Sequence, residues 1–312
     1  MTALLVASTG GHLAELVELA PRLGVERRCW ATFDTPQSRS LLAGEEVHFV
    51  PEATSRDPIG TLRDYVAAKR LLRSRQFERV VSTGASVALA FFLPATAAGI
   101  PCTYIESATR TAGPSLTGRL VARIPGVQLF TQYPGWADDD WRYGGSVFDG
   151  FVAEEQGTGR VARVVVTLGT HPKYQFPRLL RRLVEIMPAD AEVLWQIGHT
   201  RIDAMPPGAR QVVPVAELEA AIRDADVVIA HAGVGSALAA LRAGRRAIFV
   251  PRRRQHGEHI DDHQVDLARE LDQRQLVLAR EADEITAEDL KQAAQWSVRA
   301  NPAAAPFSLV VK

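Results

Sequence analysis

Four short stretches place small residues beside a histidine or a hydroxyl side chain, each at the end of an apolar run: "STGGH" (8–12), "STGAS" (82–86), "TLGTH" (167–171) and "HAGVGS" (231–236). Glycine permits tight turns and close approach of the backbone to a ligand. A helix that starts after such a turn offers free N–H groups and a positive end, which suit an anion. The pattern predicts phosphate-binding turns, and their residues are Gly10, Gly11, Gly84, Ser86, Gly169, Thr170, Gly233, Gly235 and Ser236.

Two histidines in these turns could accept a proton or donate a hydrogen bond to a substrate. His12 lies at the start of a predicted helix, where a neutral imidazole can take a proton from an alcohol near neutral pH. The alternative is that His12 only caps the helix. His231 can donate a hydrogen bond to a phosphoryl oxygen, and the alternative there is a close-packed turn between a strand and a helix.

A nicotinamide cofactor is disfavoured. "STGGH" is not G-x-G-x-x-G, and no acidic residue follows a second strand at the dinucleotide spacing, Asp34 being the nearest candidate. We therefore expect no cofactor.

The stretch "RRRQHGEHIDDHQ" (252–264) gathers histidines and carboxylates after an apolar strand. Its possible metal ligands are His256, Glu258, His259, Asp262 and His263. The spacing is not H-E-x-x-H, and the groups need not converge, so we expect no metal. Carboxylate and amide groups at a helix start suit sugar hydroxyls equally well. Arg252–Arg254 are either a solvated basic patch or a contact for phosphate or anionic lipid.

Apolar runs of strand length alternate with helical patterns, which indicates parallel sheets covered on both faces. We expect strands at 3–8, 28–33, 47–50, 79–83, 102–107, 128–132, 161–170, 191–199, 210–215, 225–233, 246–251 and 275–279. We expect helices at 12–23, 36–43, 60–75, 86–99, 175–187, 215–225, 235–244 and 261–273. The predicted organisation is a domain over 1–150, a linker over 151–160, a second domain over 161–300 and a tail over 301–312 that crosses back or frays.

Composition narrows the function classes. The chain has 312 residues, 36 Lys and Arg against 36 Asp and Glu, so a strongly basic nucleic-acid binder is not suggested. The two cysteines have no metal-ligand spacing, and no secretory leader opens the chain, which predicts a cytoplasmic protein. The apolar stretch 85–100 is short for a bilayer and contains Pro94, so a buried helix is expected rather than a membrane-facing surface.

The combination of motifs identifies a family resemblance over about residues 3–290. "STGGHLAEL", "STGAS", "YIESATRTAGPSLTGRL" and "LFTQYP" resemble the acceptor-side subunit of the bipartite N-acetylglucosaminyltransferase that extends dolichol-diphosphate-linked N-acetylglucosamine. Bacterial counterparts act in capsule and exopolysaccharide assembly. "VTLGTH", "QIGH", "ADVVIAHAGVGSALAALRAG" and "VPRRRQHGEHIDDHQ" resemble the donor-side subunit, so both halves are fused here.

The resemblance implies an α/β GT-B glycosyltransferase, with two Rossmann-like doubly wound domains facing across a cleft. It implies inverting, metal-independent transfer from a UDP-sugar to a hydroxyl. His12 is then the general base or positions the acceptor, and Glu106 in "YIES" either orients His12 or is itself the base. The implied donor-site residues are Gly169, Thr170, Gln196, Gly198, His199, His231, Gly233, Gly235, Ser236, Glu258, Asp262 and Gln264.

The implied partners are a UDP-sugar and a lipid-linked or soluble acceptor. The basic stretch 69–79 predicts peripheral contact with the inner membrane face, the alternative being a solvated helix face. Two other functions stay open. One is a UDP-sugar 2-epimerase on the same fold, and the other is a non-catalytic nucleotide-sugar-binding partner of another transferase.

Overall fold

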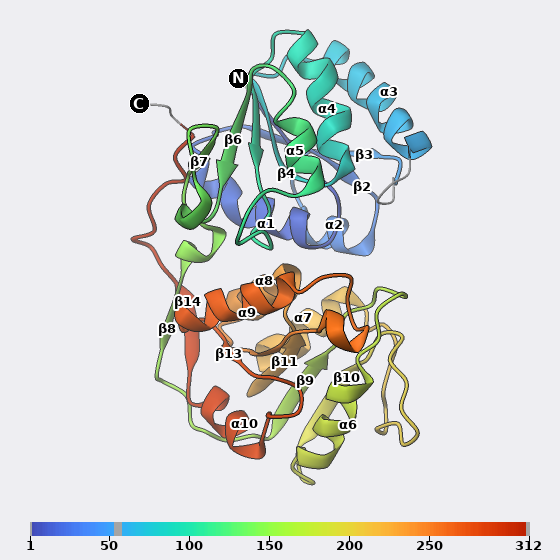
Figure 1. The fold of residues 1–312 in the computed structure, drawn as a ribbon, viewed down its shortest axis with the longest axis vertical. Helices are drawn as coiled ribbons and strands as arrows, with labels where there is room; N and C mark the ends of the chain where they lie inside the picture. The colour runs from blue at the N-terminus through green and yellow to red at the C-terminus, as the bar shows by residue number, and fades with distance from the viewer. Residues whose placement is uncertain (1, 53–57, 310–312) are drawn as a thin grey trace. The chain divides into compact units, whose positions relative to one another are not determined.

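The computed structural model describes residues 2–52 and 58–309. The chain divides into two compact units (Figure 1). The first comprises the chain up to Asp149 together with the segment from Ala304, and the second is Gly150–Ala303. The tail returns to the first unit, because the Phe307 amide donates to the carbonyl of Arg22 (2.9 Å) and the Phe307 ring meets Phe130 edge-on.

The first unit is built on one parallel sheet. In the described residues its strands are β1 (Ala3–Ala7), β2 (Arg28–Phe33), β3 (Val47–Val50), β4 (Arg79–Gly84), β5 (Cys102–Ile105), β6 (Val127–Thr131) and β7 (Trp141–Tyr143). Their order is β3-β2-β1-β4-β5-β6-β7, and every pairing is parallel. The connections after β1 and β4 run to opposite sides of the sheet, and such a switch point is where ligands bind in open α/β sheets. "STGGH" and "STGAS" follow these two strands.

Helices of the first unit lie in two groups. The α-helices are α1 (Gly11–Leu19), α2 (Pro36–Leu41), α3 (Pro58–Ser74), α4 (Ser86–Ala97) and α5 (Leu116–Val121), and the 3-10 turns are η1 (Ala20–Arg22), η2 (Pro134–Trp136) and η3 (Val147–Gly150). Helices α3, α4 and α5 contact one another in a row, while α1 contacts α2 (Figure 1). The helix expected over 12–23 becomes 3-10 around Pro21, whose ring cannot sit in an α-helix interior.

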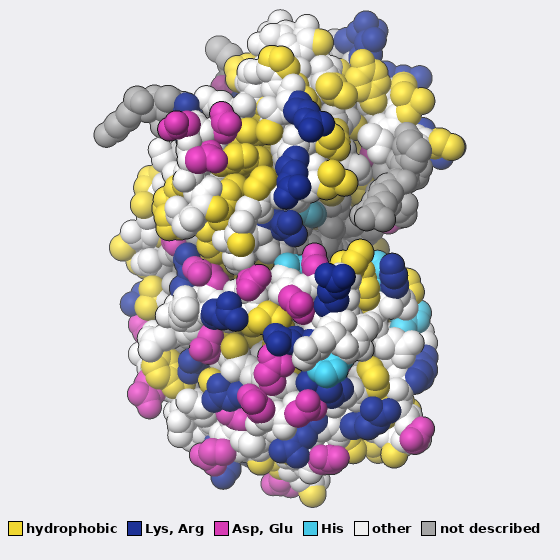
Figure 2. All heavy atoms as spheres, viewed as in Figure 1, with side chains coloured by type: hydrophobic (Ala, Val, Ile, Leu, Met, Phe, Trp, Pro, Cys, Tyr) yellow, Lys and Arg dark blue, Asp and Glu magenta, His cyan; other side chains and the backbone are white. Residues whose placement is uncertain are grey.

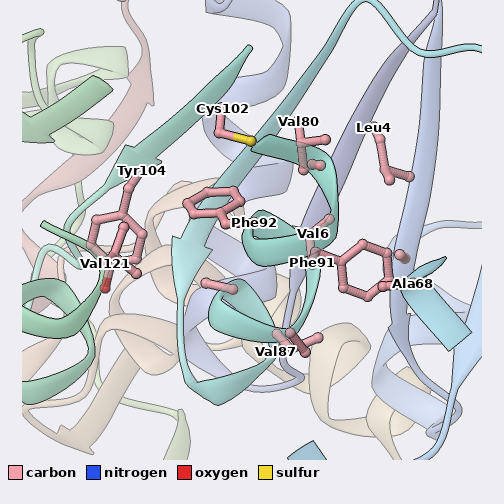
Figure 3. Packing of buried hydrophobic residues seen from close by; sticks show 14 of the residues in the cluster. Leu4, Val6, Ala68, Val80, Val87, Phe91, Phe92, Cys102, Tyr104 and Val121 are labelled. Atoms are coloured by element: carbon pink, nitrogen blue, oxygen red, sulfur yellow. The ribbon is translucent and has the colours of Figure 1, made fainter. Parts of the chain in front are cut away.

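The core of the first unit follows from strand alternation. Leu4 and Val6 of β1 pack with Ala68, Phe91 and Phe92 from α3 and α4 (Figure 3). The stretch predicted as a buried helix forms α4, which is buried along most of its length because its sequence is apolar all round. Burying each phenylalanine contributes roughly 1.5–3 kcal/mol.

The second unit repeats the design with a different strand order. Its strands are β9 (Arg163–Thr167), β10 (Glu192–Gln196), β11 (Val227–His231), β12 (Ile248–Val250) and β13 (Leu278–Ala279). The order is β10-β9-β11-β12-β13, again parallel throughout. The switch point falls between β9 and β11, so "TLGTH" and "HAGVGS" leave the sheet side by side.

One part of the second unit's core packs against two of its helices, α6 and α10. Its α-helices are α6 (Pro177–Ile186), α7 (Val215–Asp224), α8 (Val234–Arg242), α9 (His263–Gln273) and α10 (Ala287–Ala294), with a 3-10 turn η4 (Arg254–His256). Leu179 and Leu183 of α6 and Leu290 of α10 pack on Val166 and Ile229 of the sheet.

Two predicted segments are wrong. Residues 151–160 were expected as a linker, but the first four form β8 (Phe151–Glu154), which pairs antiparallel with β14 (Ser297–Ala300). Phe151 and Val152 are residue types that favour strands, and Phe151 is buried. Residues 210–215 were expected as a strand, but only Arg210 makes a single bridge to Gln196. Pro214 cannot donate to a ladder, and α7 begins directly after it.

Among the described residues, none of the helices has both the length and the apolar character that crossing a membrane would need.

Candidate functional site

His231 ends β11, and its imidazole lies between two glycine turns. Nδ1 is 3.5 Å from the carbonyl oxygen of Thr167 at the end of the neighbouring strand β9. A Cβ on Gly169 would lie 2.9 Å from the ring's Cε1, and one on Gly233 2.8 Å from its Nε2. Both approaches are closer than real Cβ atoms make, so glycine at both positions leaves room for the ring. Burial, and then the charge of Arg252, lower the pKa of His231 to about 3, so it is neutral at pH 7.

Helix α8 begins directly beside this ring. Its N-cap is Gly233, which has no side chain to accept from the first turn, and the first intrahelical bond runs from Ala237 to Gly233 (2.9 Å). The amides of Val234, Gly235 and Ser236 precede that bond, so they lack intrahelical partners and point out of the helix end. Free amides and the positive end of the helix dipole together favour an anion there.

Arg252 adds a fixed positive charge to the same place. It follows β12 and is buried, with Nη2 donating to the carbonyl of Leu168 and to that of Tyr174 (3.3 Å). Its Nε has no hydrogen-bond partner among the described residues. Burial lowers the pKa of Arg252 to about 10, so it remains charged at neutral pH. Arg252 is therefore not part of a solvated basic patch, whereas Arg254 is exposed.

Gln196, which ends β10, and the residues that follow it support the loop that contains Gly169. Gln196 holds two neighbours with one side chain, since its Nε2 donates to Thr167 Oγ1 (2.9 Å) and its Oε1 accepts from the Val213 amide (2.9 Å). Gly198 lets the two loops touch, because a Cβ there would lie 2.0 Å from the carbonyl oxygen of Gly169. Thr170 is exposed and His199 half-buried, and both lie on these loops.

The carboxylates predicted to bind sugar hydroxyls make hydrogen bonds within the protein. Glu258 is buried and accepts from Arg178 Nε and Nη2, both at 3.2 Å, and from the Arg253 amide (2.9 Å). Asp262 accepts from the Arg254 amide (3.0 Å), and Gln264 Oε1 from the Arg252 amide (3.0 Å). These bonds fix the loop that carries Arg252. A direct donor contact by these three residues stays a prediction, with less free bonding capacity than the sequence suggested.

The five possible metal ligands of this loop do not all come together. Glu258 and Asp262 are used as described, and His256 is exposed beside Gln255. His259 and His263 do come together, around Asp261, which sequence reasoning had passed over: Asp261 Oδ1 lies 3.1 Å from His259 Nδ1 and also contacts His263 Nδ1.

His12 in the first unit has a defined orientation. Its Nδ1 lies 2.9 Å from the carbonyl oxygen of Thr83 in β4, and Thr83 Oγ1 donates back to the His12 carbonyl (2.7 Å). A carbonyl only accepts, so Nδ1 carries the proton and the lone pair of the neutral ring is on Nε2. Burial lowers the pKa of His12, which keeps the ring neutral. Gly84 makes room, since a Cβ there would lie 3.0 Å from Cε1 of His12.

Among the described residues, no hydrogen bond joins Glu106 to His12. Its carboxylate accepts from the amides of Ser107 (3.1 Å) and Ser115 (2.9 Å), from the Ser115 hydroxyl (3.0 Å) and from Tyr104 (3.3 Å). Glu106 is buried, and burial raises its pKa. The observed role is to hold the chain between β5 and α5. The alternative prediction, that Glu106 is the base, is weakened because its oxygens are already engaged.

Glu15 is a functional candidate that sequence reasoning missed. It is fully buried on α1 and accepts from Ser107 Oγ (2.7 Å), the Ala108 amide (2.9 Å) and Gln132 Nε2 (3.0 Å). Burial, with a smaller contribution from Glu106, raises the pKa of Glu15 to about 7. The available signal was a carboxylate between Leu13 and Leu16 on the buried face of a short helix.

The remaining predicted turn residues lie at the starts of α1 and α4. The Gly10 amide donates to Gln37 Oε1 (2.6 Å), so this amide is already used. Gly11 begins α1, whose N-cap Gly10 provides no side-chain cap. Ser86 begins α4 after Ala85, which also gives no side-chain cap. Two helix starts without side-chain caps, those of α1 and α4, therefore lie at the switch point of the first unit.

Sequence comparison finds known proteins that are similar to this chain. Residues 163–306 match the glycosyltransferase family 28 C-terminal domain. The UDP-N-acetylglucosamine–N-acetylmuramyl-(pentapeptide) pyrophosphoryl-undecaprenol N-acetylglucosamine transferase of Neisseria meningitidis is 24% identical over 275 residues, which cover 80% of this chain and 76% of that protein.

Solved structures show the same fold. MurG of Acinetobacter baumannii aligns with a TM-score of 0.55 and 19% identity, covering 93% of this chain and 89% of that one. The glycosyltransferase SnogD of Streptomyces nogalater aligns with a TM-score of 0.57 and 22% identity, covering 94% and 92%. The UDP-GlcNAc 2-epimerase of Methanocaldococcus jannaschii is also similar, with a TM-score of 0.52, 11% identity and coverage of 99% and 96%, so the fold alone does not separate transfer from epimerisation. The chain therefore has the GT-B fold of two Rossmann-like units, and its second unit matches the family 28 glycosyltransferase domain, which supports glycosyltransferase activity.

Proposed function

We propose that this chain is an inverting glycosyltransferase that moves a sugar from a UDP-sugar to a hydroxyl of a polyprenyl-diphosphate-linked sugar in cell-surface polysaccharide assembly. The second unit binds the donor and the first binds the acceptor. The observation that carries the proposal is the anion site at the start of α8, where free amides, His231 and Arg252 meet. The N. meningitidis transferase, which acts on an undecaprenol-linked substrate by its name, supports the choice of acceptor.

On the donor side, the site stabilises a leaving diphosphate. The amides of Gly235 and Ser236 donate to phosphoryl oxygens, and Arg252 offsets their charge. When the bond from the anomeric carbon to the β-phosphate oxygen breaks, its electron pair stays on UDP, so negative charge grows where these donors already point. Because amides and a guanidinium supply this stabilisation, we propose that transfer needs no metal.

On the acceptor side, His12 takes the proton. Its Nε2 carries the lone pair, because Nδ1 is held by the Thr83 carbonyl. The acceptor oxygen forms a bond to the anomeric carbon from the face opposite the leaving group, and its proton passes to Nε2. A residue that only capped the helix would not need this tautomer or the space that Gly84 leaves.

A surface on α3 fits the expected contact with the inner membrane face. Ile59, Leu62 and Val66 are exposed at helical spacing, and the basic stretch continues with exposed Lys69 and Arg70. Hydrophobic and basic side chains lie together over this unit (Figure 2). An apolar strip beside cations is suited to an anionic lipid surface. Vesicle flotation tests this: binding should need phosphatidylglycerol and fall in Leu62→Asp, whereas equal flotation of both proteins would refute it.

UDP binding and UDP release together test the enzymatic function. Isothermal titration should show UDP binding that is lost in Ser236→Pro, which deletes a donor amide, and retained in His12→Ala. With a polyprenyl-diphosphate-linked acceptor, wild type should release UDP from a panel of UDP-sugars, and His12→Ala should be slowed by about 10²- to 10⁴-fold.

Each other result points elsewhere. UDP-sugar conversion without acceptor, yielding an epimer, would identify an epimerase. UDP binding with no turnover and a silent His12→Ala would identify a binding partner of another transferase. UDP affinity unchanged in Ser236→Pro would remove the donor site from α8.

A further inference from the structure

We propose that His259, Asp261 and His263 form a binding site for a divalent transition-metal ion of the Zn²⁺ class. The site lies in the loop that leads into α9, and none of its three residues is needed for the transfer chemistry proposed above. The inference stands independently of that function.

The three ligand atoms already converge. One nitrogen of each histidine and one oxygen of Asp261 all lie within 4.8 Å of one another. His259 Nδ1 is 3.1 Å from Asp261 Oδ1, and His263 Nδ1 contacts the same oxygen. Ligands on a tetrahedral Zn²⁺ with bonds of about 2.0–2.1 Å lie about 3.3 Å apart, so an ion needs only a small opening of this cluster. The spacing H-x-D-x-H supplies all three from one short loop.

Neighbouring rings hold the ligands in place. Tyr174 stacks on His259 with ring centroids 4.4 Å apart, and the ring of His171 lies 4.8 Å from that of Tyr174. His259 meets His263 edge-on at 4.7 Å. A ligand ring that is packed in this way loses less freedom when it binds a metal.

The site is reachable and leaves a coordination position open. The side chains of His259, His263 and Asp261 are 12%, 24% and 44% exposed. Three protein ligands leave a fourth position for water or an anion.

The donor set selects the metal. Two imidazole nitrogens and one carboxylate suit Zn²⁺, Ni²⁺ and Co²⁺, whereas Mg²⁺ prefers an all-oxygen shell. Asp261 provides one negative charge. The positive charge of Arg252, which acts on His259, opposes a dication, so an anionic fourth ligand is favoured.

Cobalt titration of the untagged full chain, without nucleotide, is the test. Co²⁺ should give one equivalent of visible d–d absorption at tetrahedral intensity, and Zn²⁺ should displace it while excess Mg²⁺ should not. His259→Ala and His263→Ala should each weaken the binding by more than the roughly 10- to 100-fold that loss of an outer partner costs. His256→Ala removes an exposed histidine of the same loop and should change affinity less than twofold.

Asp261→Asn keeps the shape but removes the charge, and it should weaken Co²⁺ binding in the same way. Thermal unfolding without metal checks that each variant is folded. No saturable absorption in wild type, or equal losses in His256→Ala and His259→Ala, would overturn the proposal and leave a hydrogen-bonded His–Asp–His cluster. UDP titration of the same samples reports on the donor site separately.

Discussion

Gly233→Ala is a single-methyl test of the donor site. The backbone at Gly233 has φ −111° and ψ 142°, which alanine adopts without strain, so the fold should persist. The added Cβ would lie 2.8 Å from Nε2 of His231, and an ordinary contact begins at 3.4 Å. The ring must therefore withdraw by about 0.6 Å. The contact of Nδ1 with the Thr167 carbonyl is long (3.5 Å), so the neutral ring can carry its proton on Nε2 and donate from there to a phosphate. Such a hydrogen bond loses its length and direction with a shift of this size.

The loss can be given a size. A hydrogen bond to a charged group contributes roughly 1.5–3 kcal/mol, so the Kd for UDP should rise by about 10- to 100-fold. Isothermal titration of wild type and Gly233→Ala with UDP measures it. Gly135→Ala is the matched control, because a Cβ there meets nothing within 4 Å, and its affinity should be that of wild type. Equal UDP affinity in Gly233→Ala and the control would refute the idea that His231 binds the diphosphate.

Three further predictions concern buried charges. Burial lowers the pKa of His12, and the base must be neutral, so the acid limb of the pH profile of kcat/KM should lie below pH 6.5. An acid limb at or above pH 6.5 would argue against His12 as the base. Glu15 holds its proton more tightly in the folded state, so stability should fall by about 3 kcal/mol as pH rises from its ordinary pKa of 4.5 to about 7; urea unfolding of Glu15→Gln should lack that decline. Glu258→Gln leaves Arg178 without its buried partner and should cost about 3 kcal/mol of unfolding free energy; adding Arg178→Met should recover part of this, and a double variant no more stable than Glu258→Gln would contradict the pairing.

The strand–helix turns that we propose as the donor site were predictable because their signals are local. A run such as "DVVIAHAGVGS" joins a buried strand to a helix whose first turn has no capping side chain, and both properties depend on neighbouring residues. The prediction of phosphate-binding turns at Gly233 and Gly235 therefore rests on spacing that the fold retains. The same holds for α4, whose apolar sequence predicts burial.

Contacts between distant segments were not predictable in the same way. Glu258 reads as a free carboxylate in its loop, but Arg178 reaches it from α6, which lies 80 positions away. The sequence suggests Glu106 as a partner for His12. In the structure, however, the Ser115 amide donates to Glu106, and His12 is hydrogen-bonded to the Thr83 carbonyl. Which donor reaches a buried acceptor depends on how distant segments pack, and a single sequence does not reveal that packing.

The sequence by itself determined the two doubly wound units and the turns after their strands, since hydrophobic periodicity and glycine act over a few residues. Only the tertiary structure decided that Arg252 is buried at the carbonyl of Leu168, that Glu15 is buried beside Ser107, and that Asp261 rather than Asp262 joins the two histidines. The physical reason is that strand order sets which loops become neighbours, and desolvation then acts on whatever charge is enclosed between them.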